Sequence, residues 1–234
     1  MKKNKNICWF CIICLIPVFA GCNNTTQNNN NIPPRIRAAL KSNSPGTVKA
    51  TVFVEGPDGN SLSGAVVVVK DSRNSLLQLI YESSSGSYTG MLEELPGETV
   101  YTVEAASILS SNIISLGVPY SCLTAAPNVT VFQDSEGNSV LSGQSLSSGL
   151  PVQIGWSDCG EGAVYQITIR TALKTVYAVS SNACTITVPA RTIPAGAYLL
   201  EVSAQKIHGD LYYRSAPYYS ASFINAPLVS CNVK

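Results

Sequence analysis

The sequence predicts an all-β fold made of two tandem β-sandwiches. In several short segments apolar and polar residues alternate with a period of two, which is typical of strands that are buried on one face. Ser/Gly and Pro/Gly turn signals separate these segments at intervals of about eight to twelve residues, as expected for sandwiches. Beyond the amino-terminal segment no helical periodicity is found. The 213 residues that follow position 21 are enough for two domains of ordinary size.

The first 22 residues have the layout of an export signal. Lys2, Lys3 and Lys5 form a basic head, residues 7–20 are apolar, and a small residue precedes Cys22. A membrane-spanning helix needs about 20 apolar residues, so this run is too short for a typical anchor. Phe19-Ala20-Gly21-Cys22 resembles the lipobox of bacterial lipoproteins, although Phe19 stands where leucine is more usual. The alternatives are an ordinary secretion signal and a retained helix.

The lipoprotein resemblance implies a lipid anchor on Cys22. In that family the cysteine thiol receives a diacylglyceryl group, residues 1–21 are removed, and the new amine is acylated. Several acyl chains hold a protein durably at a membrane, whereas one does so only reversibly. Asn23, rather than aspartate, follows the cysteine, which is consistent with sorting to the outer membrane. The expected location is therefore the bacterial cell envelope, with the membrane as the first partner.

Residues 22–45 are predicted to be a flexible tether. Asn and Thr dominate positions 23–31, and Pro33-Pro34 follow. Such a polar tract cannot bury enough apolar surface to offset the entropy of ordering it.

Residues 46–125 are predicted to form the first sandwich. Its expected strands are residues 48–54, 65–69, 76–82, 87–92 and 99–105, and the Ser-rich residues 107–121 are expected to supply a closing strand and a linker. The order of landmarks resembles the carboxypeptidase regulatory-like, transthyretin-like family. These landmarks are Asp58-Gly59-Asn60, Gly64-Ala65 with four valines, Gly86-Ser87-Tyr88, Pro96-Gly97 and Tyr101-Thr102-Val103.

Residues 126–234 are predicted to form the second sandwich. Val152, Ile154 and Trp156 alternate toward one face, and a similar alternation starts at Tyr165. Residues 194–204, with Tyr198 after a Pro-Ala-Gly turn, complete a pattern that resembles the fibronectin type III family. The resemblance implies an immunoglobulin-like sandwich in which Trp156 is a core residue of strand B and Tyr198 is a corner tyrosine.

Four cysteines follow Cys22, and export to an oxidising compartment favours up to two disulfides. They lack the paired CxxC spacing of zinc sites. In the fibronectin-like topology strands B and E are neighbours, which implies a Cys159–Cys184 disulfide at one pole. Cys122 and Cys231 are then the remaining pair.

The charge pattern excludes a basic nucleic-acid interface. After residue 21 there are twelve basic and fourteen acidic residues. No Lys or Arg lies between Arg73 and Arg170, whereas nine acidic residues do: Glu82, Glu93, Glu94, Glu98, Glu104, Asp134, Glu136, Asp158 and Glu161.

Catalytic, cofactor and metal sites are not expected. His208 is the one histidine, its surroundings predict a solvated loop, and no GxSxG motif is present. Residues 134–138 begin like a calcium loop but lack its terminal ligands. The alternative of an enzyme would have to use carboxylates such as Glu93, Glu94 and Glu98.

Four tyrosines cluster near the carboxyl end. Alternation predicts Tyr213 and Tyr219 on one face and Tyr212 and Tyr218 on the other, and the latter pair is the candidate binding surface. We therefore expect a non-enzymatic envelope protein with a structural, spacer or protein-binding role. The alternative is an accessory module or surface adhesin that binds carbohydrate or peptide, the partner being an envelope or extracellular protein or a glycan.

Overall fold

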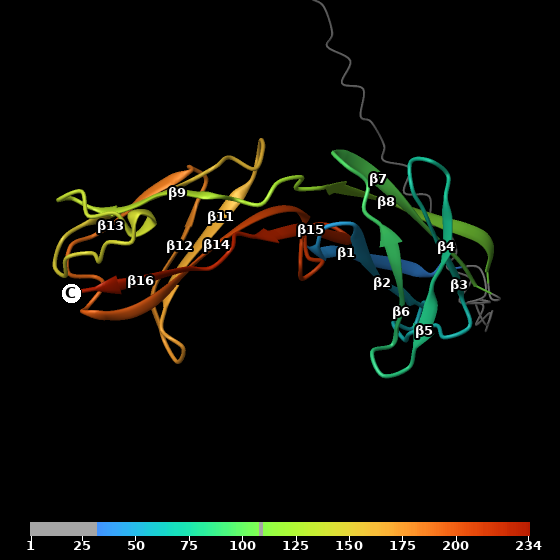
Figure 1. The fold of residues 1–234 in the computed structure, drawn as a ribbon. Coiled ribbons are helices and arrows are strands. Elements are labelled where there is room, and N and C mark those ends of the chain that lie inside the picture. Colours follow the sequence, from blue (N-terminus) through green and yellow to red (C-terminus); the bar gives the residue numbers. More distant parts are fainter. Residues whose placement is uncertain (1–31, 108–109) are drawn as a thin grey trace, which may run out of the picture.

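The computed structural model describes residues 32–107 and 110–234, and almost every element in them is a β-strand (Figure 1). The predicted all-β class is confirmed. The predicted signal peptide, Cys22 and the first part of the tether lie outside the described residues. Among the described residues no helix is long and apolar enough to cross a membrane.

The first sandwich packs two sheets around one core. One sheet contains, in order, β1 (Arg35–Ser44), β2 (Thr47–Glu55), β6 (Ser87–Glu93) and β5 (Ile80–Glu82); the other contains β4 (Leu76–Gln78), β3 (Val66–Lys70), β7 (Glu98–Ser107) and β8 (Ser110–Ser121). Val52, Val67, Tyr101 and Val103 are fully buried between the sheets. The inward residues alternate along each strand because successive side chains point to opposite faces.

The prediction of a flexible tether over residues 22–45 is wrong for its second part, because Arg35–Ser44 form strand β1. Residues 35–44 pair along almost the whole length of β2, with Ile36 opposite Val54 and Leu40 opposite Ala50. Ile36, Ala38 and Leu40 are buried, so this segment has the same period-two pattern as the strands that were predicted. The polar tract before it obscured that short pattern.

The segment predicted as one strand over residues 76–82 is two strands in different sheets. β4 pairs with β3, whereas β5 pairs with β6. Leu79 is the crossing point; it is buried and donates its N–H to the carbonyl of Val67 at 2.9 Å. Gly90 on β6 makes room for this crossing, because a Cβ there would lie 2.7 Å from the Leu79 side chain.

The second sandwich packs a three-stranded sheet against a larger one. The first contains β13 (Thr185–Val188), β10 (Val152–Trp156) and β9 (Val129–Asp134); the second contains β12 (Thr175–Ser181), β11 (Val164–Arg170), β14 (Gly196–Gly209) and β16 (Val229–Val233). This is the strand order that the fibronectin type III resemblance implies. Trp156 is 4% exposed and packs against Tyr165 with ring centroids 5.4 Å apart, so it is a core residue.

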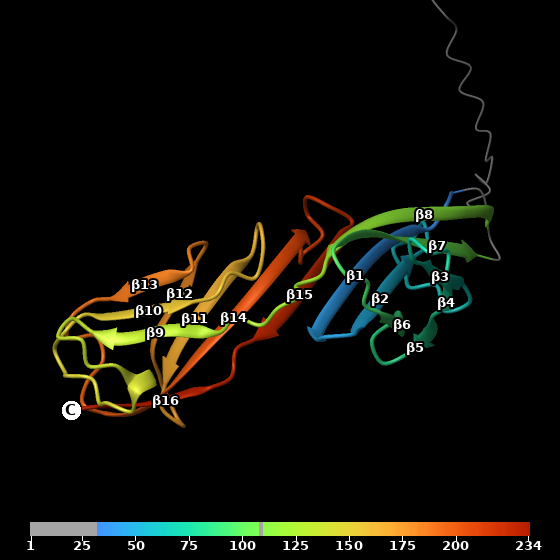
Figure 2. The same cartoon turned by 45° about the horizontal axis from the view of Figure 1, so that its top comes forward.

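β15 (Tyr218–Asn225) joins the two sandwiches into one sheet of nine strands (Figures 1 and 2). It pairs antiparallel with the carboxyl half of β14, whose amino half pairs with β16, and it pairs parallel with β1 over residues 38–42. The last residue of β14, Gly209, allows the close approach of β15, because a Cβ at this position would lie 2.1 Å from the Tyr218 carbonyl oxygen.

Two separate cores flank this shared sheet. The buried cluster of the first sandwich runs from Ile36 to Tyr120, and that of the second runs from Leu123 to Val233. In the sequence the first cluster therefore ends at Tyr120 and the second begins at Leu123, whereas β15 of the second sandwich pairs with β1 of the first.

Candidate functional site at the junction of the sandwiches

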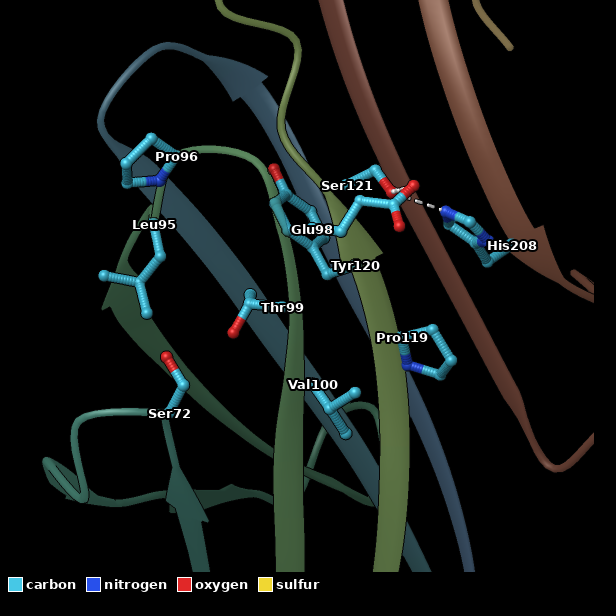
Figure 3. A pocket seen from close by; sticks show the side chains of 10 residues that line it. All are labelled: Ser72, Leu95, Pro96, Glu98, Thr99, Val100, Pro119, Tyr120, Ser121 and His208. Atoms are coloured by element: carbon cyan, nitrogen blue, oxygen red, sulfur yellow. Dashed lines mark hydrogen bonds between the residues drawn. The ribbon is translucent and has the colours of Figure 1, made fainter. Parts of the chain in front are cut away.

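A polar cluster joins the sandwiches where β14 passes β8 (Figure 3). The inward face of β14 continues past Ala204 to Lys206 and His208, which no longer face the second core. His208 Nε2 lies 2.8 Å from Ser121 Oγ, and Ser121 faces Glu98 at 3.3 Å. Lys206 pairs with the same carboxylate at 3.2 Å. His208 is therefore on a strand and in contact with the first sandwich, which corrects the predicted solvated loop.

Two buried serines of β15 reinforce the same contact. Ser220 donates a hydrogen bond to the carbonyl of Pro119, and Ser222 accepts one from the N–H of Leu123 at 3.2 Å. Ser220 is 0% exposed and Ser222 is 3% exposed. Burying a hydroxyl costs free energy unless it is hydrogen-bonded. These two hydrogen bonds therefore fix the position of β15 against the end of β8.

A hollow of about 380 Å³ lies beside this cluster. Its lining includes Leu95, Pro96, Thr99, Val100 and Pro119 together with His208 (Figure 3). The Thr99 hydroxyl has no hydrogen-bond partner within the described part of the chain. Polar side chains also line this hollow: Ser72, Glu98 and Ser121.

The Ser121–His208 contact has the distance of a nucleophile and its base, but the rest of such a site is different. Glu98 contacts the serine rather than the imidazole, and within residues 32–107 and 110–234 no hydrogen bond orients His208 Nδ1. Ser121 is only 4% exposed. A triad needs its third group on the base, so this arrangement differs from a triad, and its hydrogen bond links β14 to β8.

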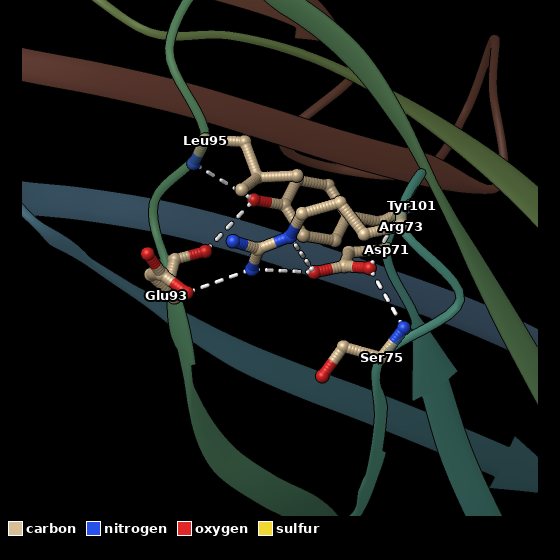
Figure 4. A network of polar contacts seen from close by, with 6 residues as sticks. All are labelled: Asp71, Arg73, Ser75, Glu93, Leu95 and Tyr101. Carbon is tan, nitrogen blue, oxygen red and sulfur yellow. Dashed lines mark hydrogen bonds and ion pairs between the residues drawn. The ribbon is translucent and has the colours of Figure 1, made fainter.

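Glu93 belongs to an ion-pair network in the first sandwich (Figure 4). Arg73 Nη2 lies 2.8 Å from Asp71 and 2.7 Å from Glu93. Asp71 also accepts the N–H of Ser75 at 2.9 Å, while Tyr101 donates its hydroxyl to the Glu93 carbonyl. Burial alone would raise the pKa of Asp71, but the hydrogen bonds from Arg73 and Ser75 lower it overall. The network fixes the β3–β4 turn against β6.

The three carboxylates of the enzyme alternative do not converge. Glu93 binds Arg73, Glu94 accepts hydrogen bonds from the N–H of Gly46 and the hydroxyl of Tyr120, and Glu98 pairs with Lys206. Burial, followed by the neighbouring Glu94 carboxylate, raises the pKa of Tyr120 strongly. Each carboxylate stabilises a different contact.

Residues 134–138 form a turn that is held together by the side chain of its first residue, Asp134. Its carboxylate accepts the backbone N–H groups of Glu136, Asn138 and Ser147 at 2.8–3.0 Å and the side-chain amide of Asn138 at 2.9 Å. These donors occupy the oxygens that a calcium ion would need. Among the described residues no group of three or more His, Cys, Asp or Glu is placed to hold a metal ion.

All four predicted disulfide cysteines are free thiols in the structure. Cys159 and Cys184 do converge: the Cys159 N–H donates to the Tyr165 hydroxyl at 2.8 Å, and Cys184 Sγ lies 3.8 Å from the same oxygen. Their pairing stays a prediction.

The Cys122–Cys231 pairing is wrong. Cys231 is opposite Tyr198 on β14, whereas Cys122 follows Ser121, which contacts His208. Tyr198 and His208 are ten positions apart on β14, or about 33 Å at the rise of a strand. Burial raises the pKa of both thiols to about 11.

The predicted tyrosine pair is not on one surface. Tyr212 is 73% exposed, but Tyr218 packs against the core of the first sandwich. The predicted alternation fails because residues 210–217 form a loop and β15 begins only at Tyr218. Tyr213 has a positive φ of 57° in this loop and contacts Phe53, with ring centroids 6.4 Å apart. Phe53 and its neighbours on β1 and β2 gave no sign of this contact in the sequence.

No family model and no curated protein matches the chain. Among solved structures, a cytokine receptor complex is similar at 10% identity with a TM-score of 0.43, covering 84% of this chain and 95% of its own. Fibronectin(III)-like modules of CbhA from Clostridium thermocellum align at 9% identity with a TM-score of 0.39, covering 85% of this chain and 92% of theirs. At these values the fold assignment depends on the strand order itself, which is that of an all-β protein with a fibronectin type III-like second sandwich.

Proposed function

We propose that this chain is a non-enzymatic structural and binding module that presents two sandwiches as one rigid body at the bacterial cell envelope. The pairing of β15 with both β14 and β1 is the observation that carries this proposal. Tandem modules joined by a single flexible linker can reorient, since interfaces between domains are usually small. Here reorientation requires breaking a sheet ladder and the buried Ser220 and Ser222 contacts.

Amide hydrogen exchange of the whole protein tests the rigid connection. The amides of residues 38–42 and 218–222 are expected to exchange as slowly as those of β10, because the protection of an amide reports the free energy of opening its segment. Exchange at the rate of the exposed 210–217 loop, with β10 still protected, would show that the sandwiches move independently.

Lipid attachment is part of the same proposal. Residues 1–22 support it through the basic head, the short apolar run and the lipobox-like ending at Cys22. A Cys22→Ser variant is expected to lose palmitate labelling and to leave the membrane fraction. Labelling that persists in this variant would place the modification elsewhere. Fractionation of the envelope would show whether the attached protein reaches the outer membrane.

A second candidate role is that of an accessory module or adhesin that binds a glycan or a protein. The exposed Tyr212 ring with the Arg214 guanidinium 5.6 Å from its centroid favours this role, because an exposed aromatic beside a cation is a common recognition element. The resemblance of residues 46–106 to carboxypeptidase regulatory-like modules belongs to this proposal as well. A Tyr212→Ala variant that keeps all binding to envelope extracts and glycans would exclude this ring as the contact.

A further inference from the structure

The outward face of β1 and β2 gathers basic side chains. Ile36, Ala38 and Leu40 point into the core, so Arg35, Arg37, Ala39 and Lys41 point outward. The register of the two strands places Arg37 opposite Phe53, Ala39 opposite Thr51, and Lys41 opposite Lys49. Together with Arg214 in the loop of residues 210–217, these side chains form a surface that we call the basic face. Its members are Arg35, Arg37, Lys41, Lys49 and Arg214.

Two of these cations directly oppose each other. Lys41 and Lys49 are both exposed and are partners across the β1–β2 ladder, an arrangement that destabilises a sheet. In the described part of the chain neither forms an ion pair, and the same is true of Arg35 and Arg214. Outside this face Lys70, Arg73, Arg170 and Lys206 each have a carboxylate partner, whereas Lys174 and Arg191 have none among the described residues. A bound anion would offset the repulsion between Lys41 and Lys49.

Aromatic rings hold the cations of this face in place. Lys41 Nζ lies 5.7 Å from the Tyr219 centroid and 5.9 Å from that of Phe223. The Arg37 guanidinium lies 5.0 Å from the Phe53 centroid and 5.1 Å from that of Tyr213, and it also binds Glu55. Side chains that are already ordered lose less entropy when a ligand binds. Arg37 and Lys41 are therefore held in place before any ligand arrives.

The length of the face suits an extended ligand. Arg37 and Lys41 are four residues apart on β1, or about 13 Å. Ala39 and Thr51, which lie between them, have small side chains. The surface is therefore lower in the middle of the face than at its two ends, where the side chains are longer. Aromatic rings beside cations can contact the apolar faces of sugar rings while the cations bind acidic groups.

A flat anionic bilayer fits this surface less well than a narrow chain does. The outward face of the same sheet continues to β6 and β5, where Glu93 opposite Thr47 and Glu82 opposite Ser87 point the same way. Glu93 is paired with Arg73, whereas Glu82 has no ion-pair partner among the described residues. A bilayer plane would bring its anionic headgroups onto the Glu82 carboxylate, which repels them. A polymer chain that follows β1 avoids this carboxylate.

We propose that the basic face binds an acidic polysaccharide, a uronic-acid polymer being the simplest example. This deepens the second candidate role above and rests on it. It is independent of the rigid connection, because Lys41 and Lys49 lie on the β1–β2 ladder and not on the contacts of β15 with β8.

Titration of the full-length protein with alginate tests the proposal, with neutral dextran as the uncharged comparison. The double variant Lys41→Gln/Lys49→Gln is expected to weaken alginate binding at least tenfold. The matched control is Lys174→Gln/Arg191→Gln, which removes two exposed cations from the second sandwich and leaves binding within about twofold. Binding to the unaltered protein should fall steeply with added salt, and dextran should not bind.

Three outcomes would overturn the proposal. Equal loss of binding in both double variants would show that only net charge matters. Unchanged binding in Lys41→Gln/Lys49→Gln would place any site elsewhere. Stronger attachment to phosphatidylglycerol than to phosphatidylcholine vesicles, lost with Lys41 and Lys49 while alginate fails to bind, would assign the face to lipid headgroups. Replacing both opposed lysines removes their repulsion and should not lower the melting temperature, so a folding defect is not expected to obscure the result. Slow exchange of β15 would persist in every case, which separates failure here from failure of the rigid connection.

Discussion

The imidazole of His208 and the hydroxyl of Ser121 lie 2.8 Å apart, although 87 residues separate them in the sequence. One belongs to the long strand of the second sandwich and the other ends β8 of the first. A His208→Ala variant removes this hydrogen bond and is expected to lower the free energy of unfolding by about 1 kcal/mol. Urea unfolding followed by tryptophan fluorescence measures the change. The control is Leu173→Ala, at a side chain that is 98% exposed. If the unaltered protein, His208→Ala and Leu173→Ala unfold at the same urea concentration, the hydrogen bond of His208 does not stabilise the junction.

Ser222→Ala should be more costly than a surface serine substitution. The change leaves the buried N–H of Leu123 without its acceptor, and an unsatisfied buried donor costs about 1–3 kcal/mol. Ser230→Ala, at an exposed position of β16, is the matched control and should be close to neutral. Thermal unfolding compares the two. Hydrogen exchange of β15 in Ser222→Ala should also become faster than that of β10, and equal protection of both strands would argue against a local role.

The stability of the fold is expected to fall in acid because of Asp134. Burial alone would raise the pKa of its carboxyl, but hydrogen bonds from Asn138, Ser147 and Glu136 lower it below the ordinary value of 3.8. Because the folded-state pKa is the lower one, the contribution is fully present above pH 3.8 and is lost as the pH falls through the folded-state pKa. Asp134→Asn should therefore cost about 2 kcal/mol near pH 7. The difference in melting temperature between the two proteins should narrow below pH 3.8, and a constant difference from pH 7 to pH 2 would refute the assignment.

Cys159 and Cys184 are expected to join on oxidation, since both contact the hydroxyl of Tyr165. Closing a loop of about 25 residues should stabilise the fold by roughly 3 kcal/mol. Mass spectrometry of non-reduced peptides should find this link. Cys122 and Cys231 should remain alkylatable thiols that react only after unfolding, because burial raises the pKa of each to about 11. A Cys122–Cys231 peptide would be incompatible with their separation along β14.

Local pattern was enough to predict most strands. Val48 to Val54, Val152 to Trp156 and Tyr165 to Ile169 alternate clearly, and β2, β10 and β11 lie where this alternation predicts them. β1 was missed because Ile36, Ala38 and Leu40 follow a long polar tract. The crossing at Leu79 was missed because an uninterrupted strand and two short strands in different sheets have the same local pattern.

The junction could not have been predicted from periodicity. The pairing of Ala39 with Tyr219 joins residues 180 positions apart, and nothing in either segment specifies the other. The same holds for the contact of Arg37 with Tyr213, which depends on a loop conformation with positive φ. Of the candidate binding pair, exposure of Tyr212 was predicted correctly, whereas Tyr218 lies at the start of a strand whose first partner is distant.

The parallel pairing of β1 and β15 has a mechanical consequence. The chain enters this ladder at the amino end of β1 and leaves it at the carboxyl end of β15, so tension applied through Arg35 and Asn225 pulls the two strands past each other lengthwise. Evenly spaced hydrogen bonds of a parallel ladder then share the load and must rupture together, instead of opening one after another as in a peeled hairpin.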